Sequence, residues 1–202
     1  QALNAGKHVL LSKPMEIRLD RCDEMIALAG KKKLLLGLDH CRRLRPSVQS
    51  LKAAAEAGYF GRPLSVSVTL KANRTMEYFR ENGGWRGTRA LDGGVLSNQS
   101  VHHLDEILYV FGMPEAVRCD SWTQNHAIEM EDLALAVWKY AGGMVVNICA
   151  TTSYPQPSWY YQMELHGTEG AYLHREGGPE KAPITRYFKE NAWTETPPFP
   201  RE

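Results

Sequence analysis

The apolar pattern of this chain changes character near residue 60, and that change limits the folds it can adopt. Before it, a short apolar segment at His8–Leu11 precedes a helical face over 19–29 and an apolar run at Leu34–Leu38. Strand, helix and strand in that order predict a parallel pair, with the second strand buried on both faces. We expect the helix to end at Gly30, with the basic run Lys31–Lys33 in the turn that follows.

Beyond residue 60, strand signals dominate. Leu64–Leu70 alternates strictly between apolar and polar residues, which is typical of a half-buried strand. Further strand patterns lie at 117–123, 133–140, 144–151, 161–166, 171–174 and 184–188. Ala141–Gly143 and Gly167–Gly170 have the composition of tight turns, which favours antiparallel pairing. The predicted fold class is an α/β remnant followed by an α+β domain with an open, mainly antiparallel sheet.

Two helices are predicted within this second part. The first covers 47–57 and ends at Gly58; the second begins at Ser100, after the turn Gly93–Gly94, and ends before Gly112. The apolar residues of the second helix recur at helical spacing, and a polar stripe lies beside them: His102, Asp105 and Tyr109. His103 points about 100° away around the axis and is expected to be structural.

Composition excludes several classes of protein. Apolar residues at 43% and charged residues at 23% in 202 residues are ordinary for a globular chain with a sizeable core. A net charge of +1 gives no electrostatic reason to expect nucleic acid or an anionic membrane as a partner. No apolar run approaches the roughly 18 residues that span a bilayer. Four cysteines lack metal spacing and lie in apolar segments, which predicts reduced, buried thiols in a cytoplasmic protein: Cys22, Cys41, Cys119 and Cys149.

Four short motifs follow one another along the chain. They are Ala5–Pro14 (AGKHVLLSKP), Arg43–Pro46 (RLRP), Trp85–Gly87 (WRG) leading into Gly93–Asp105, and His166–Gly170 (HGTEG). Together they resemble the Gfo/Idh/MocA family of nicotinamide-dependent oxidoreductases, whose first motif is usually AGKHVxxEKP. The resemblance implies a Rossmann domain for NAD or NADP, followed by a substrate domain whose sheet often forms an oligomer interface. We therefore expect residues 1–42 to be the C-terminal part of the Rossmann domain and 43–202 the substrate-binding and oligomerisation domain.

The family's glycine-rich phosphate turn has no counterpart here, because the sequence contains no GxGxxG. The resemblance thus implies a fragment that lacks the first part of its Rossmann domain and the closing C-terminal helix of the family. Such a fragment is expected to be inactive alone.

The resemblance also assigns roles to single residues. Lys13 matches the lysine that lies beside the nicotinamide and the reacting hydroxyl, Pro14 follows it as a candidate for a cis peptide bond, and His102 matches the family's proton acceptor. The sequence departs from the family at Ser12, where Glu is usual, and at Asn98, where many members carry Asp. An amide can hold a sugar hydroxyl but cannot supply the negative charge that would raise the pKa of His102.

The remaining candidates lie around this pair. Arg43 is expected to reach the cleft between the domains and, with Lys13 and Pro14, to contact the cofactor. Substrate-binding candidates are Asn98, Asp105, Trp85 and Arg86, since aromatic and guanidinium groups suit a polyhydroxylated ring. The implied activity is hydride transfer between NAD or NADP and a secondary alcohol of a sugar, inositol or sugar derivative, in a cytoplasmic homo-oligomer assembled through the antiparallel sheet.

Two alternatives stay open at this point. His102, Asp105 and Glu106 have a spacing that can converge on a metal ion, although no ligand from another element is evident. The second alternative is a non-catalytic fragment of the same fold, used for sheet-mediated assembly or sugar binding. The chain has no motif for acyl transfer, nucleotide hydrolysis or zinc proteolysis.

Overall fold

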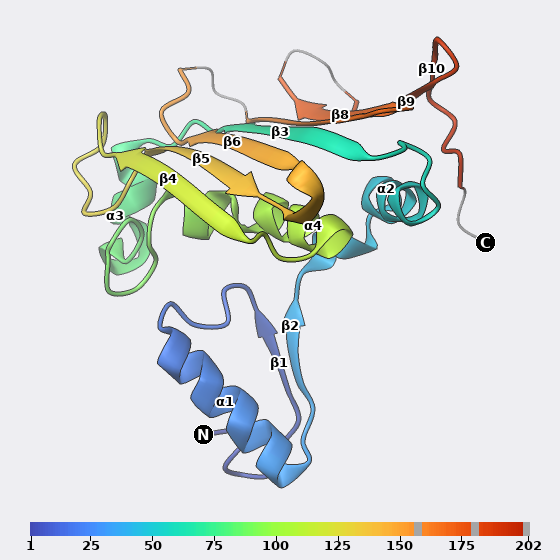
Figure 1. Cartoon of the computed structure of the whole chain (residues 1–202). Coiled ribbons are helices and arrows are strands. Elements are labelled where there is room, and N and C mark those ends of the chain that lie inside the picture. Colours follow the sequence, from blue (N-terminus) through green and yellow to red (C-terminus); the bar gives the residue numbers. More distant parts are fainter. Residues whose placement is uncertain (156–158, 179–181, 200–202) are drawn as a thin grey trace.

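The computed structural model describes residues 1–155, 159–178 and 182–199. It has two units, a small N-terminal one and a larger one built on a broad sheet (Figure 1). A short 3-10 helix, Cys41–Leu44, connects them. None of the helices in the described part of the chain is long and apolar enough to cross a membrane.

The N-terminal unit contains β1 (Val9–Ser12), α1 (Leu19–Lys32) and β2 (Leu36–Asp39). The predicted parallel pair is confirmed, with Val9 opposite Leu36. The predicted helix end at Gly30 is wrong: α1 continues through Lys32 and is closed by Lys33 in the left-handed conformation, whose N–H bonds back to the carbonyls of Ala29 and Gly30. Lys31 and Lys32 therefore lie in the last turn, where their charges meet the negative end of the helix dipole.

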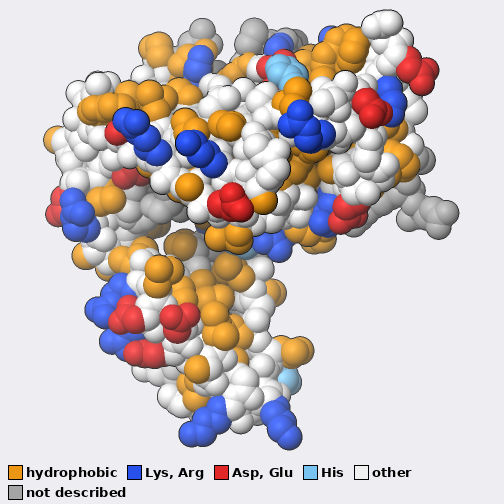
Figure 2. All heavy atoms as spheres, viewed as in Figure 1, with side chains coloured by type: hydrophobic (Ala, Val, Ile, Leu, Met, Phe, Trp, Pro, Cys, Tyr) orange, Lys and Arg blue, Asp and Glu red, His pale blue; other side chains and the backbone are white. Residues whose placement is uncertain are grey.

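The expectation that the second strand is buried on both faces is also wrong. None of the residues of β2 is buried, because α1 covers one face of the two-stranded sheet and no described element covers the other. Leu10, Leu19 and Leu35 are 77%, 80% and 73% exposed. Figure 2 shows hydrophobic side chains spread over this unit.

The larger unit is an open sheet. Among the described residues it has eight strands in the order β10-β9-β8-β7-β3-β6-β5-β4. Every neighbouring pair is antiparallel except β3 and β6, which run parallel. The strands are β3 (Pro63–Lys71), β4 (Ala116–Trp122), β5 (Leu133–Lys139), β6 (Val145–Thr151), β7 (Tyr160–Gly167), β8 (Ala171–Gly177), β9 (Ile184–Lys189) and β10 (Ala192–Thr194). The predicted fold class and both predicted tight turns are confirmed.

Three helices cover one face of this sheet: α2 (Pro46–Glu56), α3 (Met76–Gly84) and α4 (Val101–Phe111) (Figure 1). The alternation predicted for β3 is realised, with Val66, Val68 and Leu70 buried toward the helices. Leu51 of α2 and Ile107 of α4 pack into the same core. The core therefore lies between the helices and one face of the sheet, and the opposite face carries no described helix.

Several features were not predicted. Helix α3 is capped by Thr75, whose Oγ1 accepts a hydrogen bond from the N–H of Tyr78, and it is interrupted at residues 81–83. Strand β10 is short, and each of its three residues is exposed. The cysteines are free, but the prediction that they are buried is wrong: Cys41 and Cys119 are exposed, and Cys22 and Cys149 are half-buried. Cys41 falls in the connection between the units, and Cys119 lies on β4, whose residues are all exposed.

Candidate functional site

The site begins at the turn Gly93–Gly94, which leads into one turn of π-helix, Val95–Gln99, and then into α4. Gly93 has φ +79°, a conformation that costs glycine little. A Cβ on Gly94 would lie 2.5 Å from the carbonyl oxygen of Glu131, so only glycine lets the two backbones approach this closely. The N–H of Ser100 bonds to the carbonyl of Val95 at 2.8 Å, and this wider turn sets the direction in which α4 starts.

Lys13 reaches this turn from the other unit. It follows the end of β1, and the bond between Lys13 and Pro14 is cis. Its Nζ donates a hydrogen bond to the main-chain oxygen of Asn98 at 2.7 Å. Burial lowers the pKa of Lys13 below its ordinary value, and the negative charge of Asp92 acts in the opposite direction.

His102 lies one turn along the helix from Asn98 and is half-buried. Burial, and then the charge of Lys13, lower its pKa from the ordinary 6.5 to about 4. The imidazole is therefore neutral near pH 7, the form that can accept a proton. Nδ1 of His102 is buried and has no hydrogen-bond partner among the described residues. The ring of His40 stands edge-on to it, with the ring centroids 6.5 Å apart.

Asp105 and Arg43 form an ion pair at the edge of the site. The guanidinium of Arg43 donates two hydrogen bonds to the carboxylate of Asp105, at 2.8 and 2.6 Å. Nδ1 of His40 lies 3.4 Å from the same carboxylate. The structure thus joins two candidates to each other, and it places Asp105 beside His40 and Arg43.

Asp92 is a site residue that sequence reasoning missed. It is 6% exposed. Its Oδ1 accepts a hydrogen bond from Nδ2 of Asn98 at 2.6 Å, and its Oδ2 accepts one from the N–H of Gly87 at 2.8 Å. The available signal was a carboxylate directly before a glycine turn.

Trp85 and Arg86 lie in the loop after α3. The guanidinium of Arg86 stacks on the rings of Tyr78 and Trp85, at 4.5 and 4.8 Å from their centroids. Arg86 also lines a pocket of about 480 Å³ whose wall includes Phe79 and Gly87 but neither Lys13 nor His102. The stacked pair therefore lies apart from the Lys13–His102 pair, and Gly87 links the two regions through its bond to Asp92.

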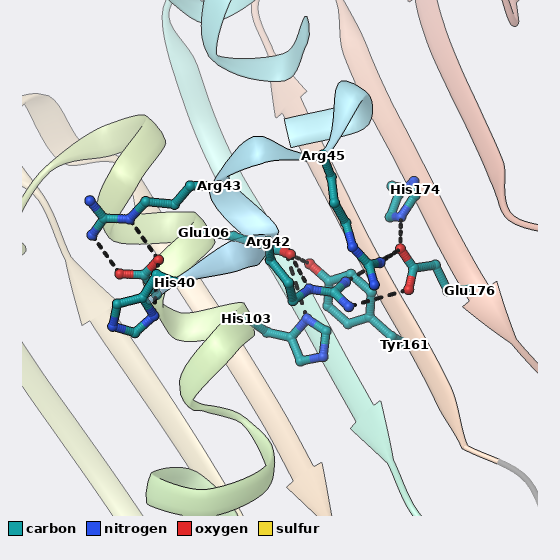
Figure 3. Close-up of polar contacts among 10 residues, drawn as sticks. His40, Arg42, Arg43, Arg45, His103, Glu106, Tyr161, His174 and Glu176 are labelled. Atoms are coloured by element: carbon teal, nitrogen blue, oxygen red, sulfur yellow. Dashed lines mark hydrogen bonds and ion pairs between the residues drawn. The ribbon is translucent and has the colours of Figure 1, made fainter. Parts of the chain in front are cut away.

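A second polar cluster is buried beside the site (Figure 3). Arg42 lies at its centre and bonds to Glu106 of α4 and Glu176 of β8. Glu106 also accepts a hydrogen bond of 2.6 Å from the hydroxyl of Tyr161. Burial raises the pKa of Glu106, but its contacts with His103 and Arg42 outweigh burial and hold that pKa below its ordinary value.

Further contacts extend this cluster outward. Glu176 accepts hydrogen bonds from His174 at 2.8 Å and from Arg45 at 2.5 Å. The ring of His103 stacks on that of Tyr161, with centroids 3.7 Å apart. Arg45 itself is exposed, and we call the other six residues the buried network: Arg42, His103, Glu106, Tyr161, His174 and Glu176. The expectation that His103 is structural agrees with its 5% exposure and its place here.

The metal alternative has little geometric basis. Asp105 is engaged by Arg43, Glu106 is engaged by Arg42, and the two carboxylates thus belong to different ion pairs. In the described part of the chain, no group of three or more His, Cys, Asp or Glu side chains could hold a metal ion.

Residues 48–173 match the model of the GFO/IDH/MocA C-terminal domain. The chain belongs to the Gfo/Idh/MocA family. The family resemblance inferred from the four motifs is thereby confirmed.

Individual relatives cover most of the chain. The 1,5-anhydro-D-fructose reductase of Ensifer adhaerens is 28% identical over 95% of this chain and 56% of its own. The scyllo-inositol 2-dehydrogenase (NADP(+)) IolW of Bacillus subtilis is 25% identical over 85% of this chain and 48% of its own. The chain thus spans about half the length of the curated relatives it matches.

Solved structures of the Gfo/Idh/MocA family have the same fold as this chain. The WlbA dehydrogenase of Chromobacterium violaceum, in complex with NADH and UDP-GlcNAcA, is 32% identical with a TM-score of 0.80 over 88% of this chain and 50% of its own. A levoglucosan dehydrogenase in complex with NADH shares the fold, with a TM-score of 0.76 at 22% identity over 93% of this chain and 56% of its own.

Proposed function

We propose that the whole protein is an NAD- or NADP-dependent oxidoreductase that transfers a hydride to or from a secondary alcohol of a sugar, inositol or sugar derivative. The observation that carries the proposal is the approach of Lys13 to the turn that bears Asn98 and His102. Relatives support the substrate class, since one is a reductase of an anhydrosugar and another a dehydrogenase of an inositol. The cofactor is supported by the NADH bound to WlbA and by the NADP named for IolW.

The residues present fit such a cofactor. Lys13 and Pro14 follow the carboxyl end of β1, the edge of a parallel sheet at which dinucleotides bind. His102 offers a buried nitrogen without a partner among the described residues, and Arg43 lies nearby across Asp105. In this proposal residues 1–42 belong to the dinucleotide-binding domain and 43–202 to the substrate domain. The nicotinamide, when bound, supplies the position that accepts or returns the hydride.

The proposed chemistry of this chain is proton transfer with electrostatic support. In the oxidation direction, neutral His102 removes the proton of the substrate hydroxyl as the hydride leaves the adjoining carbon. The ammonium of Lys13 stabilises negative charge that develops on the same oxygen. Asn98 and Asp105 hold neighbouring hydroxyls, and Trp85 and Arg86 contact the far part of the substrate. In the reduction direction the same groups return the proton.

A binding and activity screen tests the proposal. The whole protein, offered sugars and cyclitols together with each cofactor, is expected to reduce NAD or NADP and to bind it in calorimetry. The chain of 202 residues is the matched control: it contains no GxGxxG turn to hold the phosphates and is expected to bind neither cofactor well. The proposal fails if the whole protein binds neither cofactor in either redox state.

The exposed face of the sheet supports a second property, a homo-oligomer assembled through it. Outward-facing residues of β5, Leu135 and Val137, are 45% and 38% exposed, and Trp122 on the same face of β4 is 41% exposed. Large exposed apolar patches on sheets commonly mark protein interfaces.

We expect Leu135→Asp with Val137→Asp to convert the oligomer to a monomer in sedimentation velocity. Met113→Asp changes a residue that is 78% exposed and lies outside the strands, and it is expected to leave the assembly unchanged. A monomeric parent protein at every concentration would refute the interface.

A further inference from the structure

Asp92 is held on two sides by groups that do not move freely. The N–H that binds its Oδ2 belongs to Gly87, whose φ is +70° and whose Cα is so enclosed that a Cβ would lie 3.0 Å from Ile128. The turn after Asp92 is fixed by Gly94, which packs against Glu131. The carboxylate therefore presents Oδ1 to Asn98 in one defined orientation.

This contact decides which end of the Asn98 amide is free. A carboxylate accepts hydrogen bonds and cannot donate them, so the amide nitrogen must face Asp92. Oδ1 of the half-buried Asn98 then points away from Asp92, and no hydrogen bond to this oxygen is found within the described residues. An acceptor that is fixed and unoccupied, one helical turn before His102, suits a hydroxyl group of a bound polyol.

The same carboxylate also supplies charge. Two residues next to Lys13 are uncharged: Ser12 precedes it in the sequence, and the main-chain oxygen of Asn98 accepts the hydrogen bond from its Nζ. Asp92 supplies negative charge from a different position, and its field raises the pKa of Lys13 against the effect of burial. A chain of two contacts thus runs from Asp92 to Lys13. The side chain of Asn98 bonds to Asp92, and the main-chain oxygen of Asn98 bonds to the ammonium of Lys13.

We propose that Asp92 is a positioning residue of this site, which turns the oxygen of Asn98 toward a substrate hydroxyl and sets a negative charge beside the turn that Lys13 contacts. The inference rests on the proposed function for the substrate hydroxyl. Its effect on Lys13 is a property of the chain itself and is measurable without turnover.

Moving the carboxylate tests the inference. In Asp92→Asn, the new amide keeps its oxygen on Gly87 and turns its nitrogen toward Asn98, which must flip and present a donor to the substrate. We expect kcat/KM of the whole protein to fall by about 10-fold or more, in line with the loss of a charge-assisted hydrogen bond. In the exchange variant Asp92→Asn with Asn98→Asp, donor and acceptor are swapped, a carboxylate oxygen again faces the substrate, and most of the loss is recovered.

The second readout is the reactivity of Lys13 toward an acylating reagent as a function of pH, followed by mass spectrometry of the labelled peptide. We expect the titration midpoint of Lys13 to fall by about one pH unit in Asp92→Asn, because a nearby opposite charge is lost. Asn98→Asp adds a carboxylate and is expected to move the midpoint upward, which keeps the test decisive if Asp92→Asn does not fold. Asp23→Asn, on an exposed position of α1, is the control and leaves the midpoint unchanged.

The two readouts separate the outcomes. If the whole protein turns over no sugar with either cofactor but the midpoint of Lys13 shifts as stated, the proposed function fails and the role of Asp92 toward Lys13 stands. If the midpoint is the same in wild type, Asp92→Asn and Asn98→Asp, the inference is overturned. It is also overturned if Asp92→Asn retains full kcat/KM in an active enzyme.

Discussion

Replacing His102 by alanine is expected to lower turnover of the whole protein by about 100-fold or more at neutral pH, the usual contribution of a positioned general base. The imidazole is neutral because burial and Lys13 depress its pKa to about 4, so wild type has a proton acceptor in place throughout the neutral range. The affinity for the cofactor is expected to change little. Steady-state kinetics in the oxidation direction, with cofactor binding measured by calorimetry, check both parts.

The pH profile of the same reaction adds a second check. Oxidation requires neutral His102, so wild-type kcat/KM is expected to decline on the acid side only as the pH approaches about 4, well below the ordinary 6.5. His166→Ala removes an exposed histidine on β7 and is expected to leave turnover and profile unchanged. Near-normal turnover in His102→Ala would show that another residue is the proton acceptor. Lys13 is then the stronger candidate for the proton acceptor. Tyr109 is the weaker one, because its hydroxyl already accepts a hydrogen bond from Gln49.

Replacing Arg42 by alanine is expected to destabilise the fold by about 3–5 kcal/mol, the range for breaking a buried ion pair from one side. Arg42 is 8% exposed, and its two carboxylate partners, Glu106 and Glu176, are 2% and 5% exposed. Without the guanidinium, two negative charges remain in a region that water scarcely reaches. Chemical denaturation followed by intrinsic fluorescence measures the loss.

Two further variants define what Arg42 contributes. Arg42→Lys keeps the charge but offers a single point donor in place of a planar fork, so we expect it to recover only part of the stability. Arg18→Ala removes one partner of the exposed pair between Arg18 and Asp20 and is expected to leave the denaturation midpoint unchanged. A midpoint for Arg42→Ala close to that of Arg18→Ala would show that the buried network has no stabilising role.

The features that the sequence predicts well are local ones. Strict alternation at Leu64–Leu70 predicts β3, and glycine-rich turns between apolar runs predict the antiparallel hairpins. The stop of α2 is predicted because Gly58 adopts φ +71°, which few other residues accept. The end of α1 was missed because Lys33 adopts a left-handed conformation that composition does not reveal.

Long-range contacts explain the rest of the difference. Glu176 joins Arg42 from a strand near the other end of the chain, and nothing around either residue marks it as a partner. Asp92 enters the site through the amide of Asn98 and the N–H of Gly87, and only a folded backbone brings these groups together. The burial of β2 was overestimated because an apolar run shows what a strand can bury and not whether another element covers it.

The parallel pairing of β3 with β6 has a consequence for synthesis. On the ribosome, Ser65 of β3 emerges long before its partners Val145 and His166, and at about 5–20 residues per second several seconds pass before either strand exists. Once β6 has emerged, the strands β4, β5 and β6 can form a meander from near neighbours. Helix α2 is already complete by then, and its Leu51 shares a core with the apolar face of β3. In the nascent chain, α2 can thus cover the apolar face of β3 until β6 and β7 pair with its two edges.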